Sequence, residues 1–169
     1  MPPEPPRLTL LQQRTIEARV LGPLIRAFQE ELGAERANAI ARRAIEGIAR
    51  QRGRELAGRM GRDDLEAFVE VTNTWRGQGD LEIEVLERTP TRYSFNVTRC
   101  RFAEMYRELG LADLGGILSC GRDFVLCQGF SPRIRLRRTQ TIMQGAPYCD
   151  FRYTCTPAEG QGDAPSPPA

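Results

Sequence analysis

The 169-residue sequence contains no histidine, and all 24 of its basic residues are arginine, so lysine is absent as well. Without lysine, the chain can form neither a Schiff base nor a P-loop. Without histidine, it can form no Ser-His-Asp or Cys-His catalytic pair, and it has no imidazole to bind zinc or haem. Acid–base chemistry is therefore left to carboxylates, thiols, tyrosine, water or a bound metal, because arginine is a poor base near neutral pH.

Long apolar segments are missing too. No run approaches the roughly 18 apolar residues that cross a bilayer, and the Pro-rich residues 1–7 are not followed by the apolar stretch of a signal peptide. The net charge of +2 gives no support for a nucleic-acid partner. These features predict a cytoplasmic protein without a nucleic-acid or membrane partner. They leave the oligomeric state open.

The length fits one domain. We expect residues 9–156 to form it, and the Pro/Gly-rich residues 1–8 and 157–169 to be disordered tails. Apolar residues recur at helical spacing between Thr9, a candidate N-cap, and Gly33. Gly22-Pro23 is expected to kink this helix or to divide it. Two further N-terminal helices are expected, over residues 34–57 and from Asp63-Asp64 toward Trp75.

After Gly79 the apolar residues alternate, as they do in strands. Four alternating segments predict two hairpins, residues 81–88 with 92–99 and residues 133–143 with 148–155. Helical spacing returns between the hairpins, over 102–109 and from 112 to 120 or beyond. This order predicts an α+β fold, in which N-terminal helices pack on an antiparallel sheet and a cysteine-bearing helix lies between two hairpins.

The cysteines gather in the C-terminal part of the chain, at Cys100, Cys120, Cys127, Cys149 and Cys155. In a cytosolic protein such residues are more often reduced, catalytic or metal-binding than disulfide-bonded. Cys120 and Asp123 are spaced C-x-x-D at the end of a predicted helix, and Cys149 opens the last predicted strand. Because side chains of a strand alternate between its faces, Cys149 and Asp150 cannot both line one pocket without a local bend.

Three separated motifs, FNVTRCRFAEMYRELG, LSCGRDF and RTQTIMQGAPYCDFRY, occur within about residues 60–155. Together they resemble the signature of the L-2-amino-thiazoline-4-carboxylic acid hydrolase family. The resemblance implies hydrolytic opening of the 2-aminothiazoline ring of a cysteine-derived amino acid, which gives a carbamoyl-cysteine. It places catalytic roles on Cys100, Cys120, Asp123 and Cys149, and substrate binding on Arg138, Arg152 and Asp150. Cys127 and Cys155 lie outside these motifs.

These residue types are compatible with that reaction. The ring carbon requires either an activated water or a thiolate as nucleophile, together with a proton for the leaving atom. Asp123, one helical turn from Cys120, could orient water or carry that proton if burial raised its pKa. A guanidinium suits the substrate carboxylate because it can bind both oxygens, and Arg138 and Arg152 are the candidates.

Other chemistries remain open. The sequence G-x-x-x-C-x-F at Gly145, Cys149 and Phe151 also resembles the end of the 4-vinyl reductase small-ligand-binding domain, so a non-catalytic sensor or carrier of a small ligand or thiophilic metal is the alternative. No cofactor is predicted, although Cys100, Cys120 and Cys149 could hold a soft divalent metal whose bound water would be the nucleophile. Cleavage of a carbon–metal bond by a Cys/Asp/Cys set is a third option that needs no histidine.

Overall fold

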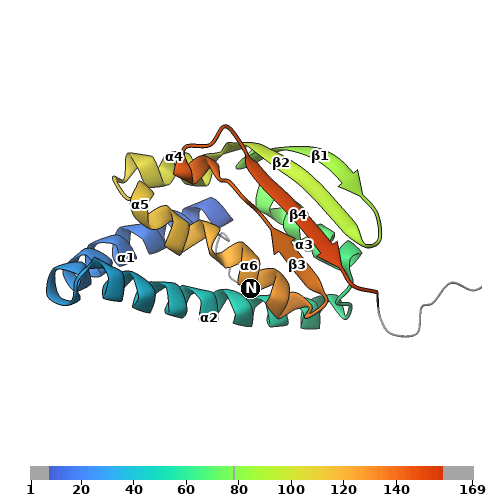
Figure 1. The fold of residues 1–169 in the computed structure, drawn as a ribbon, viewed down its shortest axis with the longest axis horizontal. Helices are drawn as coiled ribbons and strands as arrows, with labels where there is room; N and C mark the ends of the chain where they lie inside the picture. Colours follow the sequence, from blue (N-terminus) through green and yellow to red (C-terminus); the bar gives the residue numbers. More distant parts are fainter. Residues whose placement is uncertain (1–7, 78, 158–169) are drawn as a thin grey trace, which may run out of the picture.

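The structure, a computed structural model, describes residues 8–77 and 79–157, so the expected tails lie almost wholly outside the described residues. Two long helices, α1 (Leu10–Leu32) and α2 (Ala34–Met60), run side by side along one edge of the molecule (Figure 1). Thr9 is confirmed as the N-cap of α1, because its hydroxyl accepts a hydrogen bond from the Gln12 N–H within a capping box. Gly33, at φ +79°, separates the two helices.

The expected division of α1 at Gly22-Pro23 is wrong, because α1 continues through both residues as one helix. Gly22 explains part of this. It is buried, and a Cβ atom added there would lie 2.6 Å from the Leu111 side chain. The backbone of α1 thus contacts its neighbour directly at Gly22, and the flanking buried residues Ala18 and Ile25 hold the helix against the core on either side of Pro23.

Shorter helical segments surround the sheet. The N-cap of α3 (Leu65–Asn73) is Asp64, and η1 (Thr74–Arg76) follows α3. Between the second and third strands, the chain forms α4 (Arg101–Glu108), α5 (Ala112–Gly115), the π-helical segment η2 (Gly116–Cys120) and α6 (Arg122–Phe130). Among the described residues, no helix combines the length and the apolar character that crossing a membrane requires.

Four strands form one antiparallel sheet in the order β1-β2-β4-β3, which confirms the α+β prediction. They are β1 (Leu81–Arg88), β2 (Arg92–Cys100), β3 (Ile134–Arg137) and β4 (Cys149–Cys155). The third strand is much shorter than the expected 133–143. After Arg137 the backbone N–H groups of Thr139 and Gln140 donate to the Asp150 carboxylate rather than to a neighbouring strand, and a 3₁₀ turn, η3 (Ile142–Gln144), follows.

Two apolar clusters stabilise the fold. One lies between the sheet, α3 and α6, and contains Phe68, Phe95, Phe130 and Tyr153. The other joins α1 and α2 to the segment from α4 to η3, and contains Ile45, Tyr106, Leu114 and Leu118. Cys100 packs against both clusters, so it lies where the sheet and the helical layer meet.

The close contact between α2 and α6 depends on glycine. A Cβ atom added at Gly53 of α2 would collide with the backbone of α6 at Leu126 and Phe130, and one added at Gly129 would collide with the backbone of Arg50. Only a residue without a side chain permits this approach. The contact fixes α6, and with it Asp123, against the N-terminal helices.

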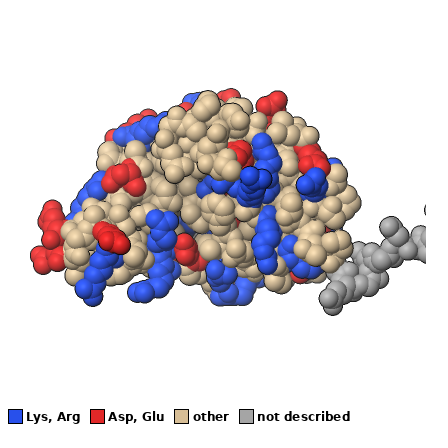
Figure 2. All heavy atoms as spheres, in the orientation of Figure 1, with Lys and Arg blue, Asp and Glu red and all other residues tan. Residues whose placement is uncertain are grey.

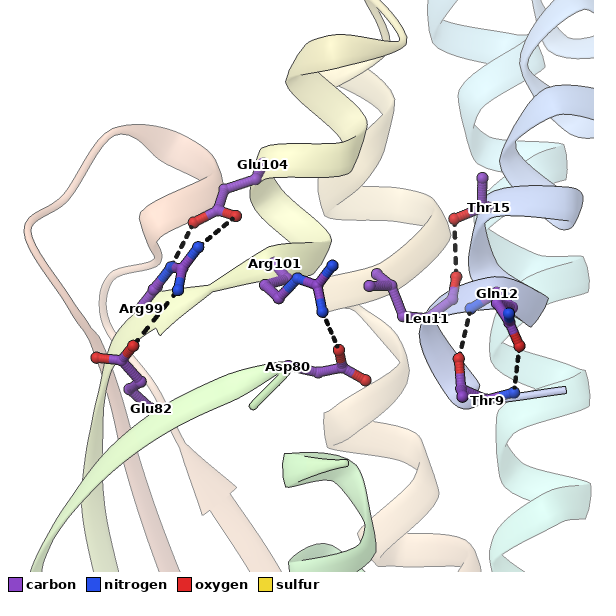
Figure 3. A network of polar contacts seen from close by, with 9 residues as sticks. All are labelled: Thr9, Leu11, Gln12, Thr15, Asp80, Glu82, Arg99, Arg101 and Glu104. Atoms are coloured by element: carbon purple, nitrogen blue, oxygen red, sulfur yellow. Dashed lines mark hydrogen bonds and ion pairs between the residues drawn. The ribbon is translucent and has the colours of Figure 1, made fainter. Parts of the chain in front are cut away.

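Ion pairs fix the junction between β2 and α4 (Figure 3). Arg99 donates to Glu104 at 2.9 Å, and Arg101 donates to the buried Asp80 at 3.1 Å. The Arg101 backbone N–H also donates to the Asp80 carbonyl. Cys100 lies between these two anchored arginines in the sequence, so its backbone position is well defined.

Candidate functional site

Cys100 and Cys149 lie at the same end of the sheet. Cys100 is the last residue of β2 and Cys149 the first of β4, and in the antiparallel register Cys149 is opposite Val97. Burial alternates along β4 as expected, with Cys149, Phe151, Tyr153 and Cys155 buried on the face that packs against the helices. Two thiols that are far apart in sequence therefore approach the same edge of the helical layer.

Cys120 and Asp123 lie at the junction of two helical segments. Cys120 ends the π-helical segment η2, in which the Gly121 N–H donates to the Gly116 carbonyl five residues earlier. Asp123 follows in the first turn of α6. A spacing of three residues places both side chains on one side of the helix. Single π-helical turns within helices are frequent at functional sites, because the extra residue displaces the side chains that follow.

Arg138 joins these groups. Its guanidinium donates to an Asp123 carboxylate oxygen at 2.6 Å and to the Cys120 carbonyl at 2.8 Å. It also lies between two aromatic rings, 4.9 Å from the centroid of Phe124 and 4.8 Å from that of Phe151. The Arg138 side chain is only 5% exposed and that of Asp123 22% exposed. The ion pair is therefore largely enclosed, and two Arg138 nitrogens are already occupied.

Electrostatic coupling shows that the cysteines and the ion pair share one environment. The pKa of Cys100 is raised to about 11 and that of Cys120 to about 12, mainly by burial and in smaller part by the nearby Asp123 and Cys149. Burial also raises the pKa of Cys149, although a hydrogen bond from the Ile142 N–H to its sulfur opposes this. At neutral pH these thiols are therefore protonated, and a nucleophilic thiolate requires a base.

Asp123 is the carboxylate whose charge acts on both Cys100 and Cys120. Burial raises the pKa of its carboxyl above the ordinary aspartate value, and the Arg138 guanidinium partly opposes that shift. Arg138 donates to Oδ2, and among the described residues no hydrogen-bond donor reaches Oδ1. A carboxylate of raised pKa with one free oxygen is a better proton acceptor than an ordinary surface aspartate.

A pocket of about 900 Å³ opens beside this cluster. Cys120, Phe124 and Arg138 form part of its wall, so one thiol and one end of the ion pair border the cavity. The opposite wall comes from α2, and a third side from the segment that follows β3. The α2 residues Asn38, Arg42 and Glu46 lie outside the motifs, whereas the third side comes from residues inside the last motif that received no role, namely Thr139, Gln140, Thr141, Met143 and Gln144.

The charged residues in the pocket wall are balanced in sign, with Arg42 and Arg138 on one hand and Glu46 and Asp113 on the other. Figure 2 shows arginine side chains gathered over the region that Figure 1 assigns to α6, β3 and β4. Of the two arginines in the pocket wall, Arg138 is paired with Asp123, whereas Arg42 forms no ion pair with any described residue. The Arg42 guanidinium in the pocket wall is therefore available to bind an anionic ligand.

Asp150 and Arg152 lie on the opposite face of β4 from Cys149. Asp150 accepts three hydrogen bonds from Thr139 and Gln140, so it shapes the segment that walls the pocket. Arg152 donates to the Phe95 and Phe151 carbonyls and to the Asn96 side chain, all at 2.8 Å. The structure does not bring these two residues together with the thiols, and their role in substrate binding stays a prediction.

The expected metal ligands do not converge as a metal site. Within residues 8–77 and 79–157, no three or more histidine, cysteine or carboxylate side chains are arranged to hold a metal ion, so Cys100, Cys120 and Cys149 are not a ligand set. Cys127 is fully buried, and its thiol donates to the Phe124 carbonyl within α6. Cys155 is buried at the far end of β4, six residues from Cys149.

Comparison with known proteins adds two findings. The model of the family described as L-2-amino-thiazoline-4-carboxylic acid hydrolase matches residues 13–153. Solved structures that are similar include the phenol-responsive sensory domain of the transcription activator PoxR with phenol, at 17% sequence identity and a TM-score of 0.53, covering 80% of this chain and 73% of that one. At this identity the similarity shows a shared fold. The comparison with curated proteins finds no match.

Proposed function

Because the chain belongs to the L-2-amino-thiazoline-4-carboxylic acid hydrolase family, we propose that it hydrolyses a small cyclic isothiourea of the 2-aminothiazoline-4-carboxylate type. One observation carries the proposal, the position of the Cys120 thiol in the wall of a 900 Å³ pocket with the Asp123 carboxylate one helical turn away. This pairs a nucleophile with a base in a chain that has no imidazole.

In the proposed reaction, Cys120 attacks the ring carbon that lies between nitrogen and sulfur. As its sulfur forms a bond to that carbon, its proton passes to Oδ1 of Asp123. The bond from the carbon to the ring sulfur then breaks, and Asp123 returns the proton to the departing sulfur. Water then adds to the carbon of the resulting enzyme-bound isothiourea, and one of its protons passes through Asp123 to the Cys120 sulfur as the bond from the carbon to that sulfur breaks. The product is a carbamoyl-cysteine. One water molecule is consumed and the enzyme is regenerated.

The other residues have positioning roles in this proposal. Arg138 fixes the orientation of Asp123 because it donates to Oδ2, and it opposes the rise in the pKa of Asp123 that burial causes. Cys100 and Cys149 lie at one end of the sheet, outside the pocket wall, and the proposal gives them no step in the reaction. The substrate carboxylate is bound by Arg42, because Arg138 is already occupied and Arg152 faces away.

The test is to incubate the purified chain with 2-aminothiazoline-4-carboxylate and to measure carbamoyl-cysteine by mass spectrometry. Cys120→Ser and Asp123→Asn should each lower turnover at least about 100-fold, the usual contribution of a nucleophile or general base. Cys155→Ser is the matched control and should retain activity, because Cys155 is buried away from the pocket. Unchanged turnover in Cys120→Ser would refute thiol attack, and inactivity of the wild-type chain would refute the proposal as a whole.

A second candidate is ligand binding without turnover. Its support is the raised pKa of every thiol near the pocket, together with the fold shared with a sensory domain. A binding protein would retain the intact heterocycle or a similar planar ligand. Isothermal titration with the same compound, followed by mass spectrometry of the recovered ligand, separates the two functions, because a sensor returns the ring unopened.

A further inference from the structure

The charged side chains of the pocket wall are two arginines and two carboxylates, and one of each sign is already paired. Arg138 is held in the ion pair described above, and Asp113 accepts two hydrogen bonds from Arg26, at 2.7 and 2.8 Å. The other two are Arg42 and Glu46. Neither forms an ion pair or a side-chain hydrogen bond with any described residue. The pocket therefore keeps one cation and one anion available for a ligand.

The uncharged polar side chains on the third side of the pocket are engaged within the protein. Thr139 and Thr141 donate their hydroxyl hydrogens to other side chains, and Gln140 donates its amide to a backbone carbonyl. A ligand that binds one of these groups has to replace an existing hydrogen bond, so it gains little. Arg42 and Glu46 therefore offer the strongest polar contacts that a ligand can gain in this pocket.

Arg42 and Glu46 are neighbours on one side of α2. Four residues advance a helix by about 6 Å along its axis and by about 40° around it, so both side chains can reach one pocket. At this spacing an arginine that precedes a glutamate is in the less favourable order for an ion pair, which agrees with the lack of contact between the two side chains. Two opposite charges that lie close together without neutralising each other match a small ligand that carries both charges.

We propose that Arg42 and Glu46 together select a dipolar ligand, one that carries a carboxylate and a planar amidinium-type cation. The inference rests on the proposed function for the identity of that ligand. In 2-aminothiazoline-4-carboxylate, the carboxylate and the amidine flank the ring nitrogen, so both charges lie along one edge of the ring when the amidine is protonated. Arg42 binds the carboxylate, and Glu46 accepts hydrogen bonds from the ring N–H and the exocyclic N–H. These two donors have the fork geometry that makes guanidinium–carboxylate pairs bidentate.

Glu46 then contributes to reactivity as well as to recognition. A carboxylate beside the amidine stabilises its protonated form, because an opposite charge favours the charged state of a group. Positive charge on the amidine makes the ring carbon a better acceptor for the Cys120 sulfur. Because α2 binds the edge of the ring that carries both charges, the ring carbon and the ring sulfur extend from α2 toward the wall that contains Cys120.

Isothermal titration of the full chain with Cys120→Ser, which leaves the ring unopened, tests the proposal with three ligands. The first, 2-aminothiazoline-4-carboxylate, carries both charges; 2-thiazoline-4-carboxylate lacks the amidine, and 2-aminothiazoline lacks the carboxylate. Adding Glu46→Gln should weaken binding of the first ligand at least about tenfold and that of the second less than about twofold. Glu55→Gln is the matched control, because Glu55 pairs with Arg52 on α2 outside the pocket wall, and it should change neither affinity.

Exchanging the two charges tests whether they act as a pair. Arg42→Glu and Glu46→Arg should each weaken binding of the dipolar ligand, and the double exchange should bind it more tightly than either single variant, because the ligand can bind reversed.

Three results would overturn the proposal. They are an unchanged affinity of Glu46→Gln for the dipolar ligand, an equal loss of affinity for the ligands with and without the amidine, and no binding of any of the three ligands below about 1 mM. Binding that follows these charges while the wild-type chain turns over no substrate would support the dipolar site and refute only the hydrolase function.

Discussion

Replacing Arg138 with methionine tests the enclosed ion pair at the centre of the site. Methionine keeps most of the volume of the side chain but removes the guanidinium that donates to Asp123 and to the Cys120 carbonyl. Breaking a buried pair by removing one partner costs about 3–5 kcal/mol, because the remaining charge loses its compensation. Loss of the stacking on Phe124 and Phe151 adds about 1 kcal/mol. Partial exposure of Asp123 reduces the sum, so we expect a loss of about 3 kcal/mol.

The pH dependence of this loss is specific. In the wild type, burial raises the pKa of Asp123 and Arg138 opposes it; without Arg138, only the more distant Arg14 and Arg122 still lower that pKa. In Arg138→Met, the pKa of Asp123 in the folded protein is thus further above its pKa in the unfolded chain. Such a group stabilises the fold fully below its unfolded pKa, and the stability is lost as pH rises through the folded pKa. The variant should therefore be most destabilised near neutral pH and should recover as the solution is acidified toward pH 4.

Urea denaturation followed by the fluorescence of Trp75, at pH 7 and at pH 5, measures the effect. The double variant Arg138→Met with Asp123→Asn leaves no buried charge, and should regain at least half of the lost stability at pH 7. Arg137→Met, at an exposed neighbouring position, is the control and should change stability by less than about 0.5 kcal/mol. A loss below 1 kcal/mol in Arg138→Met, or a double variant no more stable than the single one, would refute the claim that this pair is enclosed and coupled.

Three further predictions follow from the same structure. Because burial raises the pKa of Cys120 to about 12, its alkylation by iodoacetamide should be slow at pH 7 and should accelerate about tenfold per pH unit up to pH 9, as mass spectrometry of the modified peptide would show. Gly53→Ala should destabilise the fold by about 2 kcal/mol in thermal unfolding, whereas Gly47→Ala, on the open side of the same helix, should stabilise it by about 0.5–1 kcal/mol. Arg42→Gln should raise KM for the carboxylate substrate at least about tenfold with little change in kcat, and a neutral amide of that substrate should lose this sensitivity.

Local rules were enough to predict much of the fold from the sequence. Thr9 caps α1 because a hydroxyl at that position satisfies an unpaired N–H, and this depends only on neighbouring residues. The burial of Cys149, Phe151 and Tyr153 follows from the two-residue period of a strand whose other face is polar. The length of the third strand was overestimated because the alternation of apolar and polar residues continues past Arg137. The backbone there donates to the Asp150 side chain instead, a tertiary contact that no pattern within 133–143 reveals.

The site was less accessible to prediction than the fold. The convergence of Cys100, Cys120 and Cys149 around a cavity was expected from the family motifs; of the three, Cys120 borders the pocket, and a shared role for all three stays a prediction. Arg42 was not found, because an arginine on the polar side of a helix resembles any solvated surface residue until another element approaches it. The π-helical turn that ends at Cys120 has no reliable sequence signature, since one inserted residue alters the backbone bonds without altering the helical pattern.

Because the chain has no histidine, proton transfer in the cluster around the pocket depends on its thiols, its tyrosine and its carboxylate. Burial raises the pKa of Cys100 to about 11 and that of Cys120 to about 12, and it raises the pKa of Tyr153 well above the ordinary tyrosine value. Asp123 is then the acidic group of this cluster that titrates below these thiols, with a pKa that burial raises above the ordinary aspartate value. If it is the base, kcat/KM should rise with pH along a single acidic limb displaced above the ordinary aspartate pKa, and Asp123→Asn should abolish that limb. An imidazole-like limb near pH 6.5 that persists in Asp123→Asn would mean that the proton acceptor lies outside the cluster of thiols and carboxylate altogether.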